Sequence, residues 1–302
     1  MAPTIEFRHL TKSFGETHAV TDLSFTVEPG RVTGFLGPNG AGKSTSLRCL
    51  TGLVRPTSGA ALIDGRPYHE LEDPIRRVGV AFDSGGFHPG RTGRNNLKVM
   101  ALAAGIEIEA VEHVLALVGM TEAADRRVEG YSMGMKQRLA IAGALLGDPQ
   151  VLLLDEPANG LDPEGIAWMR AFLRARAAAG ATVLISSHVL SEVQQTVDDV
   201  VIIAHGRLVK NCSLEELVAS TSTHVVARTP DAERLAAALQ EGVDGHVPTG
   251  VHRSNHDVLN VEGLPIALVG RAALRAGVEL HGLTESTTDL EQVFLNLTGG
   301  AA

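Results

Sequence analysis

One short stretch of the chain has the residue types and spacing of a phosphate-binding loop. The sequence Gly37-Pro38-Asn39-Gly40-Ala41-Gly42-Lys43-Ser44-Thr45 fits the pattern G-x-x-x-x-G-K-[ST]. Its glycines allow a tight turn that directs several N–H groups toward one anion. Lys43 can reach the outer phosphates of a nucleotide, and the Ser44 hydroxyl can ligate Mg²⁺. A glycine-rich turn could match by chance, but a predicted strand before the loop and a predicted helix after it favour phosphate binding.

Two carboxylates directly follow a run of four aliphatic residues. Residues 151–154 are suited to a central parallel strand, and Asp155 and Glu156 come next. A carboxylate at the carboxyl end of such a strand is well placed to bind Mg²⁺ beside a phosphate loop. A second carboxylate can orient and deprotonate an attacking water. A surface turn would also carry Asp-Glu, but the preceding aliphatic run favours the functional interpretation.

Three further residues are weaker candidates. His188 ends a predicted strand at residues 182–188, and Asp83 follows another at 77–82. Both therefore fall where ligands gather in open α/β sheets. The alternatives are a structural histidine and an ordinary turn aspartate. Phe14 lies in a predicted turn, where it either packs locally or offers a surface on which a planar base can stack.

Capping residues mark the starts of three predicted helices. Thr92 precedes a helix over residues 93–104, and Asp162 with Pro163 begins one that ends near Gly180. Ser132 precedes a helix that runs to Leu146, with a glycine in its first turn. That N-terminus is a second candidate anion site, although an ordinary capped helix explains the same residues.

The remaining pattern predicts an α/β fold. Residues 4–28 alternate apolar and polar positions, which is typical of antiparallel strands. Apolar runs within residues 32–36, 77–82, 151–154, 182–188 and 198–203 predict a buried parallel sheet. Helical spacing over residues 108–118 lies within a helical region from 92 to 147.

Composition and charge restrict the function. The chain has 302 residues, 44% of them hydrophobic, and its net charge is −9. An acidic chain without a Lys/Arg run argues against sequence-independent binding to nucleic acid. The N-terminus has no basic region followed by an apolar stretch, so no signal peptide is expected. No apolar run approaches the roughly 20 residues that span a bilayer. Two cysteines, Cys49 and Cys212, are too few for a disulfide framework.

In their order and spacing, these motifs resemble those of the nucleotide-binding subunit of ATP-binding cassette (ABC) transporters. The resemblance covers residues 4 to about 218. Besides the phosphate loop, Tyr131–Arg138 resembles the family's signature, and Leu152–Glu156 resembles its second nucleotide motif. Asn159–Asp162 is similar to its dimer loop, His188 to its switch histidine and Phe14 to the aromatic that stacks on adenine.

The resemblance implies a role for each of these positions. Lys43 and the loop amides would hold the phosphates of ATP, while Ser44 and Asp155 would serve Mg²⁺. Glu156 would be the general base, and His188 would contact the γ-phosphate. Ser132, Gly134 and Met135 would cover the ATP of a second copy, which implies a dimer with two ATP molecules at its interface.

Two positions depart from the usual pattern of the family. Asp83 stands where a glutamine near Mg²⁺ is usual, and some drug and antibiotic-peptide exporters resemble this chain in carrying an acidic residue there. Met133 and Met135 stand where Gly and Gln are common. The form Y-S-x-G-M-x-Q-R-L looks typical of exporters in which a single cassette joins a separate membrane subunit.

Two domains are expected. Residues 1–218 would form the ATPase domain, a P-loop NTPase with a RecA-like parallel sheet, an antiparallel β subdomain and a helical subdomain at about 86–147. Residues 219–302 would form a small α+β accessory domain. Its predicted order is strand, helix, strand, strand, helix, strand, followed by a last helix: 223–228, 231–240, 246–251, 257–261, 266–276, 278–281 and 288–297.

The expected function is the ATPase subunit of an exporter of a drug, antibiotic peptide or lipid-like cargo. Its partners would be a second copy and a membrane permease, and it would lie peripherally on the cytoplasmic side of the cell membrane. No nucleic acid partner is expected. The alternatives are a soluble ABC-type ATPase that acts on nucleic acid or ribosomes, which usually has paired cassettes or an inserted coiled coil, and a small-molecule P-loop kinase, which would not need the signature helix.

Overall fold

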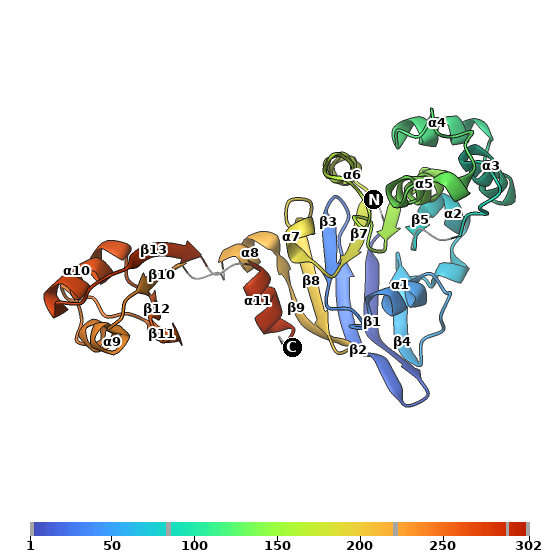
Figure 1. Cartoon of the computed structure of the whole chain (residues 1–302). Coiled ribbons are helices and arrows are strands. Elements are labelled where there is room, and N and C mark those ends of the chain that lie inside the picture. The colour runs from blue at the N-terminus through green and yellow to red at the C-terminus, as the bar shows by residue number, and fades with distance from the viewer. Residues whose placement is uncertain (1–2, 83–85, 220–222, 288–289, 300–302) are drawn as a thin grey trace. The chain divides into compact units, whose positions relative to one another are not determined.

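The computed structural model describes residues 3–82, 86–219, 223–287 and 290–299 of the chain (Figure 1). It divides into two compact units. The first comprises Met1–Leu214 together with Leu297–Ala302, and the second comprises Glu215–Asn296. Each unit has a hydrophobic core of its own.

A six-stranded sheet forms the centre of the first unit, in the order β5-β6-β7-β3-β8-β9. The first five strands in this order are parallel, and β9 pairs antiparallel with β8. Their bounds are Val78–Ala81, Val151–Leu154, Thr182–Ser187, Val32–Leu36, Asp199–Ala204 and Arg207–Ser213. The predicted parallel strands are confirmed. Strand β9 consists of exposed and half-buried residues and contains no apolar run, so the sequence pattern did not predict this strand.

A three-stranded antiparallel sheet packs beside the central one. Its order is β2-β1-β4, with bounds Thr17–Val27, Ile5–Phe14 and Ser58–Ile63. Phe7 and Phe25 of this sheet stack at 4.5 Å between ring centroids, and Phe25 lies 5.3 Å from Phe35 of β3. Apolar positions that alternate along β1 and β2 thus join the two sheets in one core, as the pattern predicts.

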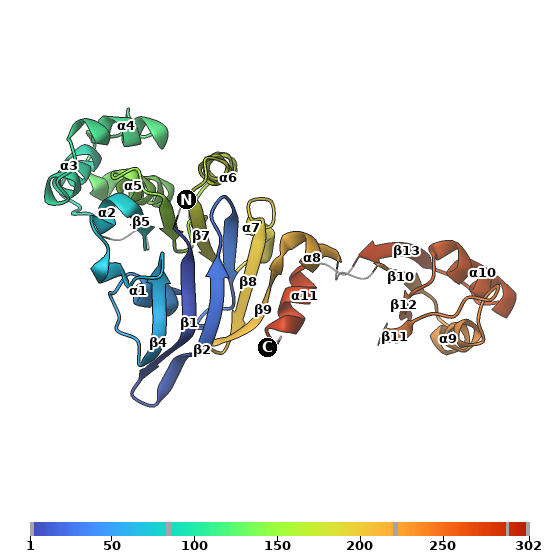
Figure 2. The same ribbon diagram turned by 180° about the vertical axis from the view of Figure 1, so that it is seen from behind.

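Helices surround the central sheet of the first unit. Helix α1 (Lys43–Leu50) follows β3 and lies beside β4 (Figure 2). Three helices gather at one side of the unit (Figure 1): α3 (Gly93–Ala103), α4 (Glu109–Leu117) and α5 (Met133–Leu145). Helix α6 (Pro163–Ala178) precedes β7, and the short α2 (Pro74–Arg77) and α7 (Leu190–Val193) were not predicted. The three predicted caps are confirmed, because Thr92, Ser132 and Asp162 each accept an N–H of the first turn.

The second unit is a four-stranded antiparallel sheet with two helices. The sheet order is β11-β12-β10-β13, with bounds Gly250–Asn255, Val258–Glu262, Thr223–Arg228 and Gly282–Thr287. Helices α9 (Ala232–Gln240) and α10 (Ile266–Ala276) pack with the sheet around one apolar core. Two further short helices lie at the two ends of this unit in sequence, α8 (Leu214–Ala219) and α11 (Leu290–Leu297).

The predicted order of elements in the second unit is confirmed, but two strands lie later than predicted. Val243 and His246 exchange backbone hydrogen bonds in a tight turn, so β11 begins only at Gly250. Residues 278–281 are not a strand. Gly277 ends α10 with φ +63°, and Val278 N–H donates to Ala273 O. These residues therefore form the C-terminal cap of the helix rather than a strand.

Candidate functional site

The phosphate loop runs so close to neighbouring backbone that a side chain on either of two glycines would force the backbone to move. A Cβ on Gly37 would lie 2.4 Å from Ile203 O, and one on Gly42 would lie 2.5 Å from Ala19 O. Gly42 also has φ +104°, which disfavours any L side chain. The loop is fastened on both sides, because Gly37 N–H donates to Ser187 O and Ala41 O accepts from Gly206 N–H.

The loop ends in a helix N-terminus that offers free donors. Gly42 is the N-cap of α1 and supplies no side-chain oxygen to the N–H groups of the first turn. These N–H groups, with the positive end of the helix dipole, suit an anion. Ser44 and Thr45 lie half-buried in this turn, and Asn39 and Gly40 are exposed at the loop tip. Pro38 lies half-buried between them and Gly37, and its carbonyl accepts from Ala41 N–H.

Lys43 is folded back onto the loop. Its side chain is buried, and Nζ donates to Gly37 O at 2.6 Å and to Pro38 O at 3.3 Å. Burial lowers the pKa of the Lys43 ammonium, while the carboxylates of Glu156 and Asp155 oppose that shift. The nearer carboxylate oxygen, Glu156 Oε1, lies 3.5 Å from Nζ. The lysine is thus held in place by groups that a phosphate would replace.

The two predicted carboxylates meet the loop at the carboxyl end of β6. Asp155 is buried, and Glu156 directly after it has φ +50°, an uncommon conformation for a residue other than glycine. Glu156 Oε2 lies 2.9 Å from His188 Nδ1. The strands β3, β6 and β7 therefore bring Lys43, Glu156 and His188 into one chain of contacts, as predicted from their positions at strand ends.

A pocket of about 260 Å³ lies against the two carboxylates. It is lined by Ser44, Arg48, Met133, Gln137, Asp155, Glu156 and Asn159. Its oxygen donors fit Mg²⁺, which is usually held by one or two carboxylates together with substrate phosphates. In the described part of the chain, no cluster of three or more His, Cys, Asp or Glu could hold a metal ion by itself.

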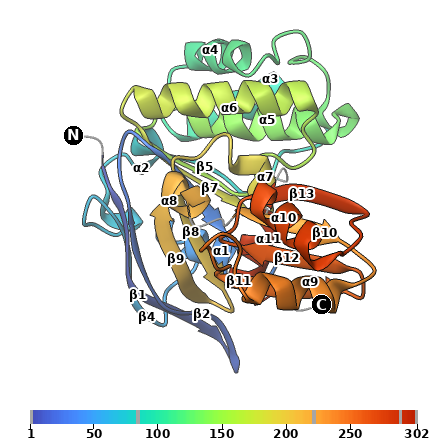
Figure 3. The ribbon, with the colours of Figure 1, turned by 90° about the vertical axis from the view of Figure 1, so that its left-hand side faces the viewer.

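The first turn of α5 lies against the loop at Asn159–Asp162. A Cβ on Gly160 would lie 2.6 Å from Met133 Cγ, and one on Gly134 would lie 2.9 Å from Gly160 O. Ser132 is exposed, and its hydroxyl accepts from Met135 N–H at 3.2 Å. Further along, α5 and α6 run side by side (Figure 3), with the Arg138 guanidinium 5.0 Å from the Trp168 ring centroid.

The geometry agrees with the comparisons with known proteins. The profile described as "ABC transporter" matches residues 20–159. A bacitracin transport ATP-binding protein of Bacillus licheniformis, BcrA, is 36% identical over 307 residues, which cover 99% of both chains. The chain belongs to the ABC transporter family. As an ATP-binding subunit of this family, it is an ABC-type ATPase.

Three further likenesses extend over all or part of this ABC subunit. The daunorubicin/doxorubicin resistance ATP-binding protein DrrA of Streptomyces peucetius is 34% identical, over 99% of this chain and 93% of that one. A solved ATP-binding subunit of an ABC transporter shares 27% identity with a TM-score of 0.65, over 71% of this chain and 92% of that one. A profile described as "Domain of unknown function (DUF8746)" matches residues 223–291.

Of the remaining predicted positions of the ABC subunit, the structure describes Phe14 but not Asp83. Phe14 ends β1 with half of its side chain exposed, and Lys12 Nζ lies 4.6 Å from its ring centroid, so it is a surface residue rather than part of the core. Asp83 lies outside the described residues. In the described helices, none combines the length and apolar character that crossing a bilayer requires.

Sequence reasoning missed two residues of the site. Arg48, one turn after Ser44 on α1, lines the carboxylate pocket. Ser186 is fully buried at the end of β7 and bonds to both carboxylate residues. The available signal was a hydroxyl residue at the end of a buried aliphatic strand, where an unbonded polar group would be costly.

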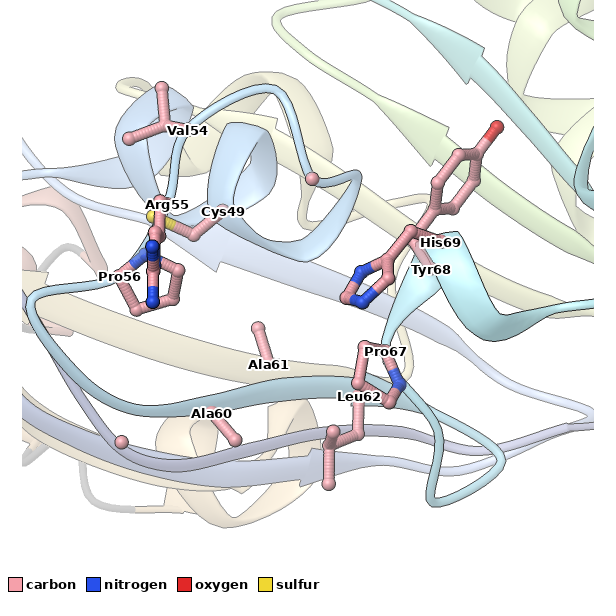
Figure 4. Close-up of a pocket in the computed structure, with 12 residues that line it drawn as sticks. Cys49, Val54, Arg55, Pro56, Ala60, Ala61, Leu62, Pro67, Tyr68 and His69 are labelled. Carbon is pink, nitrogen blue, oxygen red and sulfur yellow. The ribbon is translucent and has the colours of Figure 1, made fainter.

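A further hollow beside α1 lies away from these groups. It has a volume of about 480 Å³ and lies between the C-terminal end of α1, β4 and the turn at Pro67–His69 (Figure 4). Arg55 and His69 reach toward it across a floor formed by Ala60, Ala61 and Leu62. It shares no lining residue with the carboxylate pocket, so the larger of these two pockets is not the one beside the carboxylates.

Proposed function

We propose that this ABC subunit hydrolyses ATP to drive export through a separate membrane permease. The observation that carries the proposal is the contact chain from Lys43 through Glu156 to His188, at the helix N-terminus that follows the phosphate loop. The site combines an anion cradle, a carboxylate base and a second polar group that holds the base. This combination suits hydrolysis of a phosphoanhydride.

The residues divide the work of hydrolysis. On ATP binding, Lys43 exchanges the carbonyls of Gly37 and Pro38 for phosphate oxygens. Glu156 accepts a proton from the attacking water, and His188 fixes the orientation of that carboxylate until the γ-phosphate arrives. Ser44 and Asp155, with Asp83 as a further candidate, would hold Mg²⁺, which neutralises charge on the phosphates.

The site is half of a pair. Ser132, Gly134 and Met135 lie at the start of α5 and are not among the residues that line the pocket of their own chain. We assign them to the ATP of a second copy, where the helix N-terminus supplies donors to the γ-phosphate. Phe14 at the surface would stack on adenine.

An apolar groove offers a docking place for the permease. It has a volume of about 320 Å³ and lies between α2, β5 and helices α3 and α5. Apolar residues line it: Ile75, Val78, Met100, Ala103, Ile106 and Ala144. We commit to a short amphipathic helix of the permease as its occupant, because two residues that line the groove, Ile75 and Met100, leave large apolar side chains exposed. The subunit would then lie peripherally on the cytoplasmic face of the membrane.

The cargo follows only by likeness. BcrA carries bacitracin transport in its name, and DrrA carries daunorubicin and doxorubicin resistance. We propose an antibiotic or drug as cargo for the permease that this subunit serves. Because the net charge is −9, a nucleic acid target is disfavoured.

Replacing the base tests the hydrolytic assignment. Glu156→Gln keeps the size of the side chain but removes its basicity, so we expect ATP binding to persist while turnover falls by at least 100-fold, within the range for general bases. The variant should also accumulate as an ATP-bound dimer in size-exclusion chromatography. Hydrolysis above a tenth of the wild-type rate would contradict the role of Glu156.

Copurification tests the docking groove. Met100→Glu places a charge in the groove, and Leu102→Glu places one on the same helix outside it. From detergent extracts we expect the wild type and Leu102→Glu to retain a hydrophobic integral membrane protein that Met100→Glu loses. Equal retention by both variants would contradict docking in the groove, and recovery of RNA or ribosomes instead would favour the nucleic-acid alternative.

A further inference from the structure

Ser186 is a buried polar residue within an apolar strand. It has no exposed surface, and the three residues before it in β7, Val183, Leu184 and Ile185, are equally buried. A hydroxyl in such a place is tolerated only where it is hydrogen-bonded. Its partners therefore indicate why this strand carries a serine at that position.

Both hydrogen-bonding functions of Ser186 are used on the two carboxylate residues of the neighbouring strand. The Oγ atom accepts from the backbone N–H of Glu156 at 2.9 Å and donates to Asp155 Oδ1 at 2.5 Å. A single hydroxyl thus joins the end of β7 to the cation-binding carboxylate and to the base at the end of β6.

The two bonds act on different properties of the site. The bond to Asp155 fixes one carboxylate oxygen and leaves the remaining lone pairs for a cation. The bond from Glu156 N–H holds a residue whose φ of +50° is uncommon outside glycine. In that conformation the Glu156 side chain reaches both Lys43 and His188.

We propose that Ser186 is a positioning residue that orients Asp155 toward Mg²⁺ and holds the backbone of Glu156 in its reactive conformation. The inference rests on the proposed hydrolytic function. Partners of this kind behind a metal ligand change metal affinity by about 10- to 100-fold when they are removed. Ser186 acts only through Asp155 and Glu156 and need not touch ATP.

Three variants of the full chain test the proposal. Ser186→Ala removes the hydroxyl, and Ser186→Cys keeps the shape of the side chain but is a poor donor and acceptor. The control is Thr182→Val at the start of the same strand. Its hydroxyl is equally buried and donates to Pro3 O at 2.6 Å, far along the strand from the carboxylates. The control thus also loses a buried hydrogen bond.

The readout is binding of a fluorescent, non-hydrolysable ATP analogue as Mg²⁺ is titrated. We expect the half-saturating Mg²⁺ concentration to rise about 10-fold or more in both Ser186 variants and to stay within 2-fold of wild type in Thr182→Val. Binding of the analogue without Mg²⁺ should not change. Because Ser186→Cys preserves packing, it keeps the test valid if Ser186→Ala folds poorly.

The outcomes distinguish a failure of the proposed role of Ser186 from a failure of the proposed hydrolytic function. A wild type that binds the analogue, with Ser186 variants whose Mg²⁺ dependence is unchanged, would overturn the role of Ser186 alone. An equal shift in Thr182→Val would overturn it too, because the effect would then follow from any loss of bonding in β7. A wild type that binds no ATP analogue at all would overturn the proposed function and this inference together.

Discussion

At the scale of single residues, the site depends on backbone conformations that few side chains tolerate. Gly42 has φ +104° and Glu156 has φ +50°. Glycine adopts such a conformation at little cost, whereas an L side chain pays about 1–2 kcal/mol. Glu156 is therefore kept in a strained position by its contacts with Ser186, Lys43 and His188. Strain of this kind is typical of functional positions.

Two loop glycines allow the cost of backbone strain to be measured separately from the cost of a steric clash. Both Gly40 and Gly42 have positive φ, but a Cβ on Gly40 meets no atom within 4 Å, whereas one on Gly42 meets Ala19 O at 2.5 Å. We expect Gly40→Ala to cost about 1 kcal/mol of unfolding free energy and Gly42→Ala roughly 2–4 kcal/mol. Urea denaturation measures both, and equal costs would show that the close backbone approach is unimportant.

At the scale of elements, the candidate site residues lie close together because the carboxyl ends of parallel strands meet at one edge of the sheet. Segments β3, β6 and β7 are neighbours or next neighbours in the sheet although they are far apart in the sequence. The loop, the two carboxylates and His188 follow these three strands. Capping then fixes the helices around the edge, since Ser132 and Asp162 set the start of α5 and α6 on either side of the Asn159–Asp162 loop.

Helix α10 of the second unit is tied to the turn before β11 by charge. Asp244 pairs with Arg271 and Arg275 of that helix. Hydrogen bonding to Arg275, and then to Arg271, holds the pKa of the Asp244 carboxyl below its usual value. Since the folded pKa is lower than the unfolded one, these pairs stabilise the unit above the ordinary pKa, and the contribution is lost as the pH falls through the folded value.

This linkage makes Asp244→Asn a test with a definite sign. We expect the variant to be less stable than wild type at pH 7, and the difference to shrink as the pH falls below about 4, because the wild-type carboxyl then takes up its proton. The urea midpoint of the second unit at pH 7 and at pH 3 measures this. High salt should reduce the pH 7 difference. A difference that is constant with pH would contradict the ion pairs.

At the scale of the whole molecule, the two units have separate cores. The core of the first unit includes Phe7, Phe25, Phe35 and Leu153, whereas that of the second unit includes Leu235, Leu259 and Val261. The residues assigned to the nucleotide site belong to the first unit. A loss of packing in the second core should therefore leave the nucleotide site intact.

A single core substitution tests this independence. Leu235 is fully buried, and Leu235→Ala should destabilise the second unit by about 2–5 kcal/mol. ATP binding at 25 °C should remain within 2-fold of wild type. Leu274→Ala on α10, where 81% of the leucine is exposed, should change stability by less than about 0.5 kcal/mol. A marked loss of ATP binding in Leu235→Ala would show that the units depend on each other.

Local patterns in the sequence determined much of the first unit and its site. The phosphate loop, the strand before it and the helix after it are fixed by neighbours in the chain, since glycine placement and apolar runs act over a few residues. Strand β3 and helix α10 coincide with their predicted residues. For the same reason, the caps at Thr92, Ser132 and Asp162 were predictable from residue type and position.

Only the tertiary structure decided the features that depend on which strands become neighbours. Ser186 bonds to Asp155 because β7 pairs with β6, an adjacency that no local pattern encodes. Arg48 enters the carboxylate pocket through the placement of α1, and β9 forms only because β8 offers it an edge. Sheet order and helix docking arise from the packing of the whole domain. Local sequence patterns therefore indicated the candidate side chains, whereas the fold determined which neighbours hold them in position.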